Sequence, residues 1–101
     1  MTQEELRAKL ESYDLKGATM KQLLADRDSA RDMYLSCTRM YSDVCEADDR
    51  CYYGRRSPKE INNAVTELLR AIRSEEEMYY HHAETLEYEI NERLSKIDSN
   101  N

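Results

Sequence analysis

Hydrophobic residues in the first half of the chain recur at helical spacing, in two stretches that meet near Gly17. Thr2 with Glu5, and Thr19 with Gln22, form the capping-box pattern that marks the start of a helix. The apolar positions advance by three, four or seven residues, as one face of a helix does. They are Leu6, Leu10, Tyr13, Leu23, Ala30, Met33, Cys37, Met40 and Val44. We predict a helical arm over residues 3–45 that is kinked or broken near Gly17.

The second half carries a longer apolar stripe behind a well-marked helix start. Ser57 suits an N-cap, Pro58 suits the first helical position, and Glu60 completes a capping box. No Gly or Pro follows Pro58, and the apolar positions continue mostly in steps of three and four. They are Ile61, Val65, Leu68, Leu69, Ile72, Tyr79, Ala83, Leu86, Ile90, Leu94 and Ile97. The pattern predicts a connecting turn over 46–57, a helix over 58–97 of about 60 Å, and a frayed tail over 98–101.

These two arms predict an all-α fold, an antiparallel helical hairpin of two long helices in a single domain over residues 1–101. The composition agrees, because two Gly and one Pro are too few for the frequent turns of a sheet protein. Disorder is disfavoured since the apolar residues fall in register. A chain of 101 residues without Phe or Trp has a thin core. We therefore expect the fold to be completed by oligomerisation, with coiled-coil-like packing.

The same sequence argues against a membrane span, a secretory leader and a catalytic centre. It lacks a run of about 18 apolar residues, and its first ten residues lack a leader's apolar core, so we expect a cytoplasmic protein. Cys37 fits the core as a small apolar residue, and nothing pairs Cys45 or Cys51 with a general base. His81 is predicted to face away from the core and lacks the Glu-x-x-His pattern of helical di-metal sites. We expect no metal, no cofactor and no enzyme activity.

One short stretch, Arg50–Lys59, differs from the rest of an acidic chain. The protein has 15 basic and 21 acidic residues and a net charge of −6, yet this stretch is basic and contains no acid. Free N–H groups at a helix start favour anions, and tyrosines can stack on a base. The candidate anion or nucleic-acid contact is Arg50, Tyr52, Tyr53, Arg55, Arg56 and Lys59. The alternative is a solvated turn whose arginines balance the charge of the acidic residues just before it. So few basic residues are a weak footprint for a nucleic-acid binder.

The eight tyrosines must supply the aromatic volume of a chain that has no Phe or Trp, so most of them are expected in the core. Tyr79 and Tyr80 are adjacent and point in different directions on a helix, which leaves one for the surface or a partner. Tyrosine is also enriched at protein interfaces, because it combines apolar area with a polar tip. The candidate partner interface is Tyr79, Tyr80, Leu86, Tyr88, Ile90 and Leu94.

The overall pattern resembles that of short helical prophage proteins. The segments that carry it are "RDSARDMYLSCTRM" in the first arm, a polar gap, and "SPKEINNAVTELLRAIRSEEE" running into "LEYEINERLSKID". In this pattern the chain is similar to the N-terminal coiled region of phage late-gene transcriptional activators of the RinA/ArpU type, without their DNA-contacting helix-turn-helix. The resemblance covers most of the chain and implies a small phage or mobile-element protein that works by binding.

Three binding functions follow as hypotheses. The first is a non-enzymatic interaction protein of phage type, regulatory or acting in host takeover, that forms a homo-oligomer and binds a protein partner. The second is an acidic inhibitor that mimics nucleic acid and binds a basic host or defence protein, so that its binding depends strongly on salt. Its carboxylates would be Glu75, Glu76, Glu77, Glu84, Glu87 and Glu89. The third is a nucleotide or nucleic-acid binder that uses the Arg50–Lys59 stretch.

Overall fold

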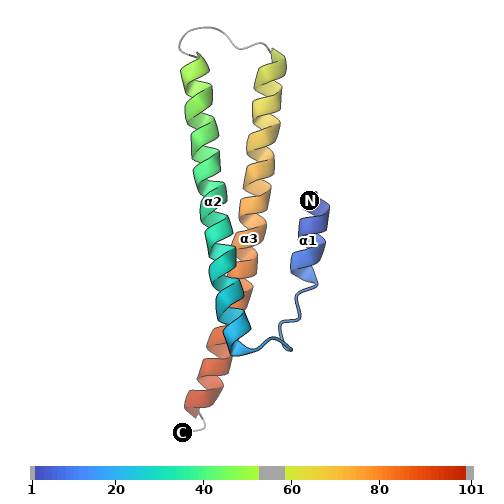
Figure 1. The fold of residues 1–101 in the computed structure, drawn as a ribbon, viewed down its shortest axis with the longest axis vertical. Coiled ribbons are helices and arrows are strands. Elements are labelled where there is room, and N and C mark those ends of the chain that lie inside the picture. Colours follow the sequence, from blue (N-terminus) through green and yellow to red (C-terminus); the bar gives the residue numbers. More distant parts are fainter. Residues whose placement is uncertain (1, 53–58, 100–101) are drawn as a thin grey trace.

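The computed structural model describes residues 2–52 and 59–99, with side chains for residues 2–47 and 63–97. Over these ranges the chain forms three helices and no strand: α1 (Gln3–Glu11), α2 (Met20–Tyr52) and α3 (Lys59–Ser99) (Figure 1). The predicted all-helical fold is confirmed. None of the described helices is both long enough and apolar enough to cross a membrane.

The first arm is two helices, α1 and α2, separated by residues 12–19. Both predicted helix starts are present: the Thr2 hydroxyl accepts from the Glu5 N–H at 3.1 Å, and the Thr19 hydroxyl accepts from the Gln22 N–H at 3.1 Å. The Gln22 side chain answers by accepting from the Thr19 N–H at 2.8 Å, which closes a full capping box. The chain therefore breaks at the linker that contains Gly17, as the change of phase in the apolar pattern indicated.

The second helix continues past the predicted end of the first arm. The prediction of a connecting turn over 46–57 is wrong for residues 46–52, which are the last turns of α2. They contain no Gly or Pro, so nothing in them stops a helix that is already propagating. The predicted helix start at Ser57 and Pro58 lies outside the described residues. The second long helix itself runs for 41 residues, from Lys59 to Ser99.

The helices α2 and α3 pack along one another in opposite directions, and α1 lies against α3 (Figure 1). The molecule measures 66 × 24 × 15 Å and is one or two helices thick in its narrow directions. Its deepest core is near the start of α2, where Leu23, Leu86 and Ile90 are almost fully buried. Tyr13, Leu15 and Ala18 of the linker and Met20, the first residue of α2, pack against this cluster.

The linker is anchored by Arg93 on α3. Its guanidinium donates to the carbonyl oxygens of Ala18 at 2.7 Å, Leu15 at 3.0 Å and Lys16 at 3.3 Å. Glu89, one turn earlier, accepts from Lys16 at 2.8 Å and from Arg93 at 3.2 Å. The hydrogen bond from Lys16, helped by Arg93, holds the pKa of the buried Glu89 carboxyl below its usual value. The charged side chains of Arg93 and Glu89 on α3 thus hold the linker, which is neither helix nor strand, in place.

Candidate protein-interaction surface

A shallow groove of about 640 Å³ runs along the face of α2 and α3 that α1 does not cover. We call it the tyrosine groove. Its apolar lining is Tyr34, Leu35, Tyr80, Ala83 and Tyr88, and its polar lining is Arg31, Glu84, Glu87 and Asn91. The side chains of Leu35 and Tyr80 are nearly half exposed, and Tyr88 is 68% exposed. Large apolar side chains gathered in one exposed groove are what a protein interface requires.

The groove exists because one face of each helix supplies its lining. On α2, Tyr34 and Leu35 follow Arg31 by three and four positions. On α3, the lining residues from Tyr80 to Asn91 likewise include pairs three and four positions apart, so each set shares a helix face. Antiparallel packing brings the two sets to the same level. Tyr34 and Tyr80 meet across the helices with ring centroids 5.4 Å apart and planes inclined by 47°. This pair forms the aromatic floor of the groove.

The rim of the tyrosine groove carries charges that are partly paired. Glu87 accepts from Arg27 at 2.7 Å and from Arg31 at 3.2 Å, which ties the rim of α3 to α2. Glu84 is 57% exposed and forms an acidic edge beside Tyr80, with its carboxylate 4.0 Å from the His81 ring nitrogen. The hydrogen bond between the Tyr80 and Glu84 side chains raises the pKa of the Tyr80 phenol above its ordinary value. The groove is therefore apolar along its floor and mildly acidic on the α3 side.

The predicted partner interface divides into exposed and internal residues. Tyr80, Tyr88 and Leu94 are exposed, and Leu94 lies near the end of α3 that extends past the start of α2 (Figure 1). Leu86 and Ile90 are buried by the linker and contribute to this chain's own core. Tyr79 and Tyr80 point apart, as predicted, with only Tyr80 on the exposed side of the pair.

Sequence reasoning missed the α2 half of the groove. Leu35 falls outside the main apolar stripe of α2, and that off-stripe position was the available signal. The sequence assigns most tyrosines to the core and does not single out Tyr34. Its place under Tyr80 depends on the register between the helices, which no local pattern reports.

The basic stretch predicted as an anion contact lies largely outside the described residues. Arg50, Tyr52 and Lys59 belong to the described helical backbone of α2 and α3, but their side chains are not part of the description. Tyr53, Arg55 and Arg56 fall in the gap between the two described ranges. The anion contact stays a prediction from sequence.

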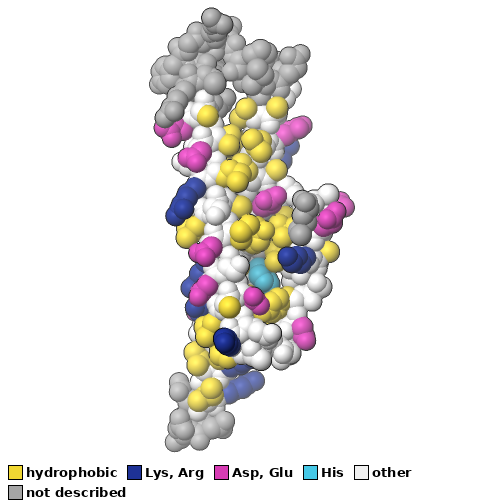
Figure 2. Space-filling model, in the orientation of Figure 1, with side chains coloured by type: hydrophobic (Ala, Val, Ile, Leu, Met, Phe, Trp, Pro, Cys, Tyr) yellow, Lys and Arg dark blue, Asp and Glu magenta, His cyan; other side chains and the backbone are white. Residues whose placement is uncertain are grey.

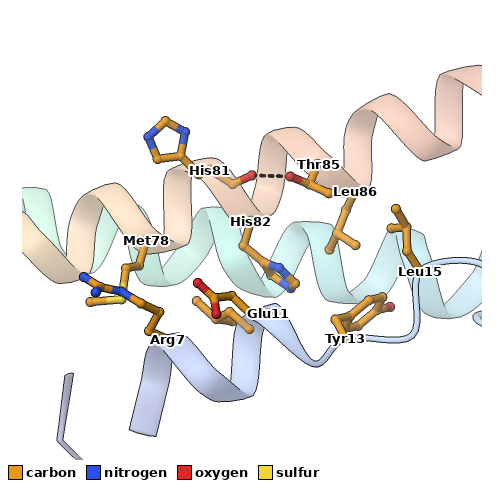
Figure 3. Close-up of a pocket in the computed structure, with 10 residues that line it drawn as sticks. Arg7, Glu11, Tyr13, Leu15, Met78, His81, His82, Thr85 and Leu86 are labelled. Carbon is orange, nitrogen blue, oxygen red and sulfur yellow. Dashed lines mark hydrogen bonds between the residues drawn. The ribbon is translucent and has the colours of Figure 1, made fainter. Parts of the chain in front are cut away.

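A second hollow, of about 440 Å³, lies between α1 with its linker and α3. Figure 3 shows His82, Leu86, Tyr13 and Leu15 pointing into it, whereas the His81 ring points away. The rings of Tyr13 and His82 meet edge to face with centroids 5.2 Å apart. Burial lowers the pKa of the His82 imidazole. Burial against Tyr13 therefore favours the neutral form of the His82 ring, which packs as part of the core.

The polar groups around this hollow have structural partners. The Tyr13 hydroxyl donates to Asp26 at 2.6 Å, and burial together with that bond raises its pKa to about 12. A phenol so hard to ionise is a poor general base at neutral pH. Cys37 is buried, which raises its thiol pKa and suits the core position predicted for it. Among the described side chains, no group of three His, Cys, Asp or Glu residues is arranged to hold a metal ion.

The function has to be argued from these surfaces. No protein-family model, curated protein or solved structure matches the chain.

Proposed function

We propose that the protein is a non-enzymatic, phage-type helical interaction protein that binds a protein partner through the tyrosine groove. The α2–α3 unit acts as a helical hairpin that presents this groove, in the cytoplasm of the host cell. The observation that carries the proposal is the solvent exposure of Leu35, Tyr80 and Tyr88 in one groove between two helices.

The shape and chemistry of the groove favour an amphipathic helix as the bound segment. A channel between two packed helices accepts a third helix through apolar anchors at spacings of three, four and seven residues. Tyr80 and Tyr88 are eight residues apart on α3 and span about 12 Å, roughly two turns of such a helix. The exposed Glu84 beside them favours a basic residue next to the apolar anchors. The partner is therefore a protein with an apolar helix face edged by Lys or Arg.

The nucleic-acid mimic receives less support from the same structure. Of its six proposed carboxylates, Glu76 and Glu89 are buried and Glu87 is paired with two arginines. Glu76 accepts from Thr38 at 2.7 Å and from Arg73 at 2.8 Å, and these bonds lower its pKa. Carboxylates held in this way are occupied within the chain and do not present an array of charges to a basic partner. Arg73 also lies 3.8 Å over the Tyr41 ring, which fixes it further.

Affinity capture from a bacterial lysate tests the proposal, with wild type compared with a Tyr80→Ala/Tyr88→Ala double variant. We expect a protein that wild type retains and the double variant loses. Leu68→Ala is the matched control, because Leu68 is 47% exposed and is not among the groove residues. Thermal melts by circular dichroism should show all three proteins folded, with at most a small decrease for the double variant, because Tyr88 is 68% exposed whereas Tyr80 loses its ring contact with Tyr34. Equal retention by the double variant, or retention of nucleic acid alone, would overturn the proposal.

A further inference from the structure

The helix α1 is held to the rest of the molecule more weakly than the linker that follows it. Within the described residues, the one hydrogen bond between α1 and α3 runs from the Gln3 side chain to the Ala71 carbonyl at 3.3 Å. The linker, by contrast, is tied by charged side chains on α3 and by the 2.6 Å bond from Tyr13 to Asp26. Hydrogen bonds to charged groups contribute more than neutral ones. The attachment of α1 therefore depends mainly on apolar packing.

The apolar packing of α1 is thin. The helix has nine residues, of which Leu6 alone is buried, and it packs on α3 but not on α2. The hollow of about 440 Å³ lies on one side of it, and a further hollow of about 380 Å³ lies on the side of α2. On the face drawn in Figure 2, hydrophobic side chains gather along the middle of the molecule, between α2 and α3 and beside α1. So short a helix is only marginally stable in water without the surface it packs on.

His82 on α3 lies between these two hollows. Its side chain lines both of them, together with Leu10 of α1 and Tyr13 of the linker. Figure 3 shows the ring pointing from α3 toward α1 and the linker, where it meets the Tyr13 ring. Because the hollows flank α1, departure of this helix opens both of them to water. The His82 ring then gains the hydration that a charged imidazolium requires.

We propose that α1 is a proton-sensitive strap, which opens from α3 when His82 is protonated and closes when the ring is neutral, while the linker and the α2–α3 pair stay in place. The pivot is Ser12, the residue between α1 and the part of the linker that Asp26 and Glu89 hold. Opening uncovers an apolar surface that includes Ala30 and Tyr79. This inference goes beyond the proposed function and does not depend on it, because the tyrosine groove lies on the face that α1 does not cover.

The charged groups around His82 do not offset the cost of burying its charge. The titratable side chains that line the two hollows with it come from α1, the linker, α2 and α3. They are Arg7, Lys9, Glu11, Tyr13, Asp26 and His81. Two are basic and two are acidic, so their charges cancel, and the His81 ring points away.

The acid that acts on His82 most directly is Asp26, which favours the protonated ring. Asp26 already accepts from Tyr13, and burial outweighs its effect, so the pKa of His82 lies below its ordinary value while α1 is closed. In the open state the ring is hydrated and its pKa moves back toward about 6.5. Closure is therefore favoured above about pH 6.5 and is weakened as the pH falls toward the pKa of the closed state.

Hydrogen exchange of the full chain, followed amide by amide by NMR, tests the proposal. Each rate is divided by the intrinsic rate at the same pH, so that protection reports the equilibrium between closed and open states. We expect the amides of α1 to be less protected than those of Leu23 and Leu86 at neutral pH. Their protection should fall further between about pH 7 and about pH 5, while the amides of α2 and α3 stay protected.

Two pairs of variants separate the strap from general loss of stability. Leu6→Ala removes the buried anchor of α1 and should lower α1 protection about tenfold or more, with α2 and α3 still protected. Leu24→Ala is the matched control, because Leu24 is 38% exposed on α2 and lines neither hollow, and it should leave α1 protection unchanged. His82→Phe and His82→Gln cannot be protonated, so both should lose the pH dependence of α1 protection. His81→Gln should keep it, because His81 is exposed.

Three results would overturn the proposal. One is equal protection of α1 and of the core amides, because α1 would then open only when the whole chain unfolds. Another is a pH dependence of α1 protection that survives in both His82 variants. The third is joint loss of protection in α1, α2 and α3 in Leu6→Ala, because the helices would then form one cooperative unit.

Discussion

Removal of the Arg93 guanidinium should detach the linker from α3. Arg93 is the one described side chain that bonds three linker carbonyls at once, at 2.7, 3.0 and 3.3 Å. Its side chain is 25% exposed, so these bonds form in a partly dry place. In Arg93→Ala the linker loses all three donors, and Tyr13 and Leu15 lose the frame that holds them over Leu86 and Ile90.

The magnitude follows from the hydrogen bonds. A bond from a charged donor contributes about 1.5–3 kcal/mol, and a neutral one about 1 kcal/mol. The three carbonyls share one cation and the exposed carbonyl of Lys16 regains water, so we expect a loss of about 2–3 kcal/mol in the free energy of unfolding. For a small domain with a total of about 5–15 kcal/mol, that is a large fraction. With a urea slope of about 1–3 kcal/mol per molar, the unfolding midpoint should fall by about 1–3 M.

Urea unfolding followed by circular dichroism measures the loss, and hydrogen exchange locates it. The amides of Leu15 and Ala18, which bond to Tyr13 and Asp14 carbonyls at 3.0 Å, should exchange faster in Arg93→Ala before the helices do. Arg93→Lys keeps the positive charge but loses the forked arrangement of N–H donors. Its unfolding midpoint should therefore lie between those of wild type and Arg93→Ala. Arg70→Ala is the surface control and should unfold like wild type. If Arg93→Ala keeps the wild-type midpoint and the same exchange rates at Leu15 and Ala18, the anchoring role is refuted.

Three smaller predictions concern the linker and its neighbours. Burial lowers the pKa of His82, so the folded state binds its proton less readily than the unfolded chain, and stability should fall as pH drops below about 6.5 toward the folded pKa. His82→Phe should remove that part of the pH dependence in urea midpoints while the exposed His81→Gln keeps it; identical slopes for both would contradict the assignment. Tyr13→Phe loses the 2.6 Å bond to Asp26 and should cost about 1 kcal/mol, and an absorbance titration of wild type should show a phenol near 12 that the variant lacks. Thr19→Ala removes the α2 cap and should cost about 1 kcal/mol in the same unfolding assay, so an unchanged midpoint would show the cap to be dispensable.

Much of the local structure could be predicted because its causes are local. The cap residues Thr2 and Thr19 act within one turn, and the structure has both helix starts where the sequence places them. The change of apolar phase at Gly17 marked the break between α1 and α2. The end of α2 lies later than residue 45, where the sequence predicts it, because the polar and acidic residues that follow contain nothing that stops a helix.

The candidate surfaces could be predicted only in part. Tyr80, Tyr88 and Leu94 were identified as interface candidates and are exposed, whereas Leu86 and Ile90 are internal. The two inner residues share the stripe with the outer ones, so no spacing rule separates them. What separates them is the linker, which folds back over one part of α3 and leaves the remainder open.

The sequence by itself determined the helices, the starts of α1 and α2 and the thinness of the core, because propensity, capping and periodicity act over a few residues. Tertiary structure alone decided which faces stay open. The tyrosine groove needs the register that sets Tyr34 against Tyr80, and the burial of Glu89 needs the linker that Arg93 holds. These are contacts between residues about 45 to 80 positions apart. Their energies depend on the simultaneous packing of several helix faces, which the sequence of a single segment does not determine.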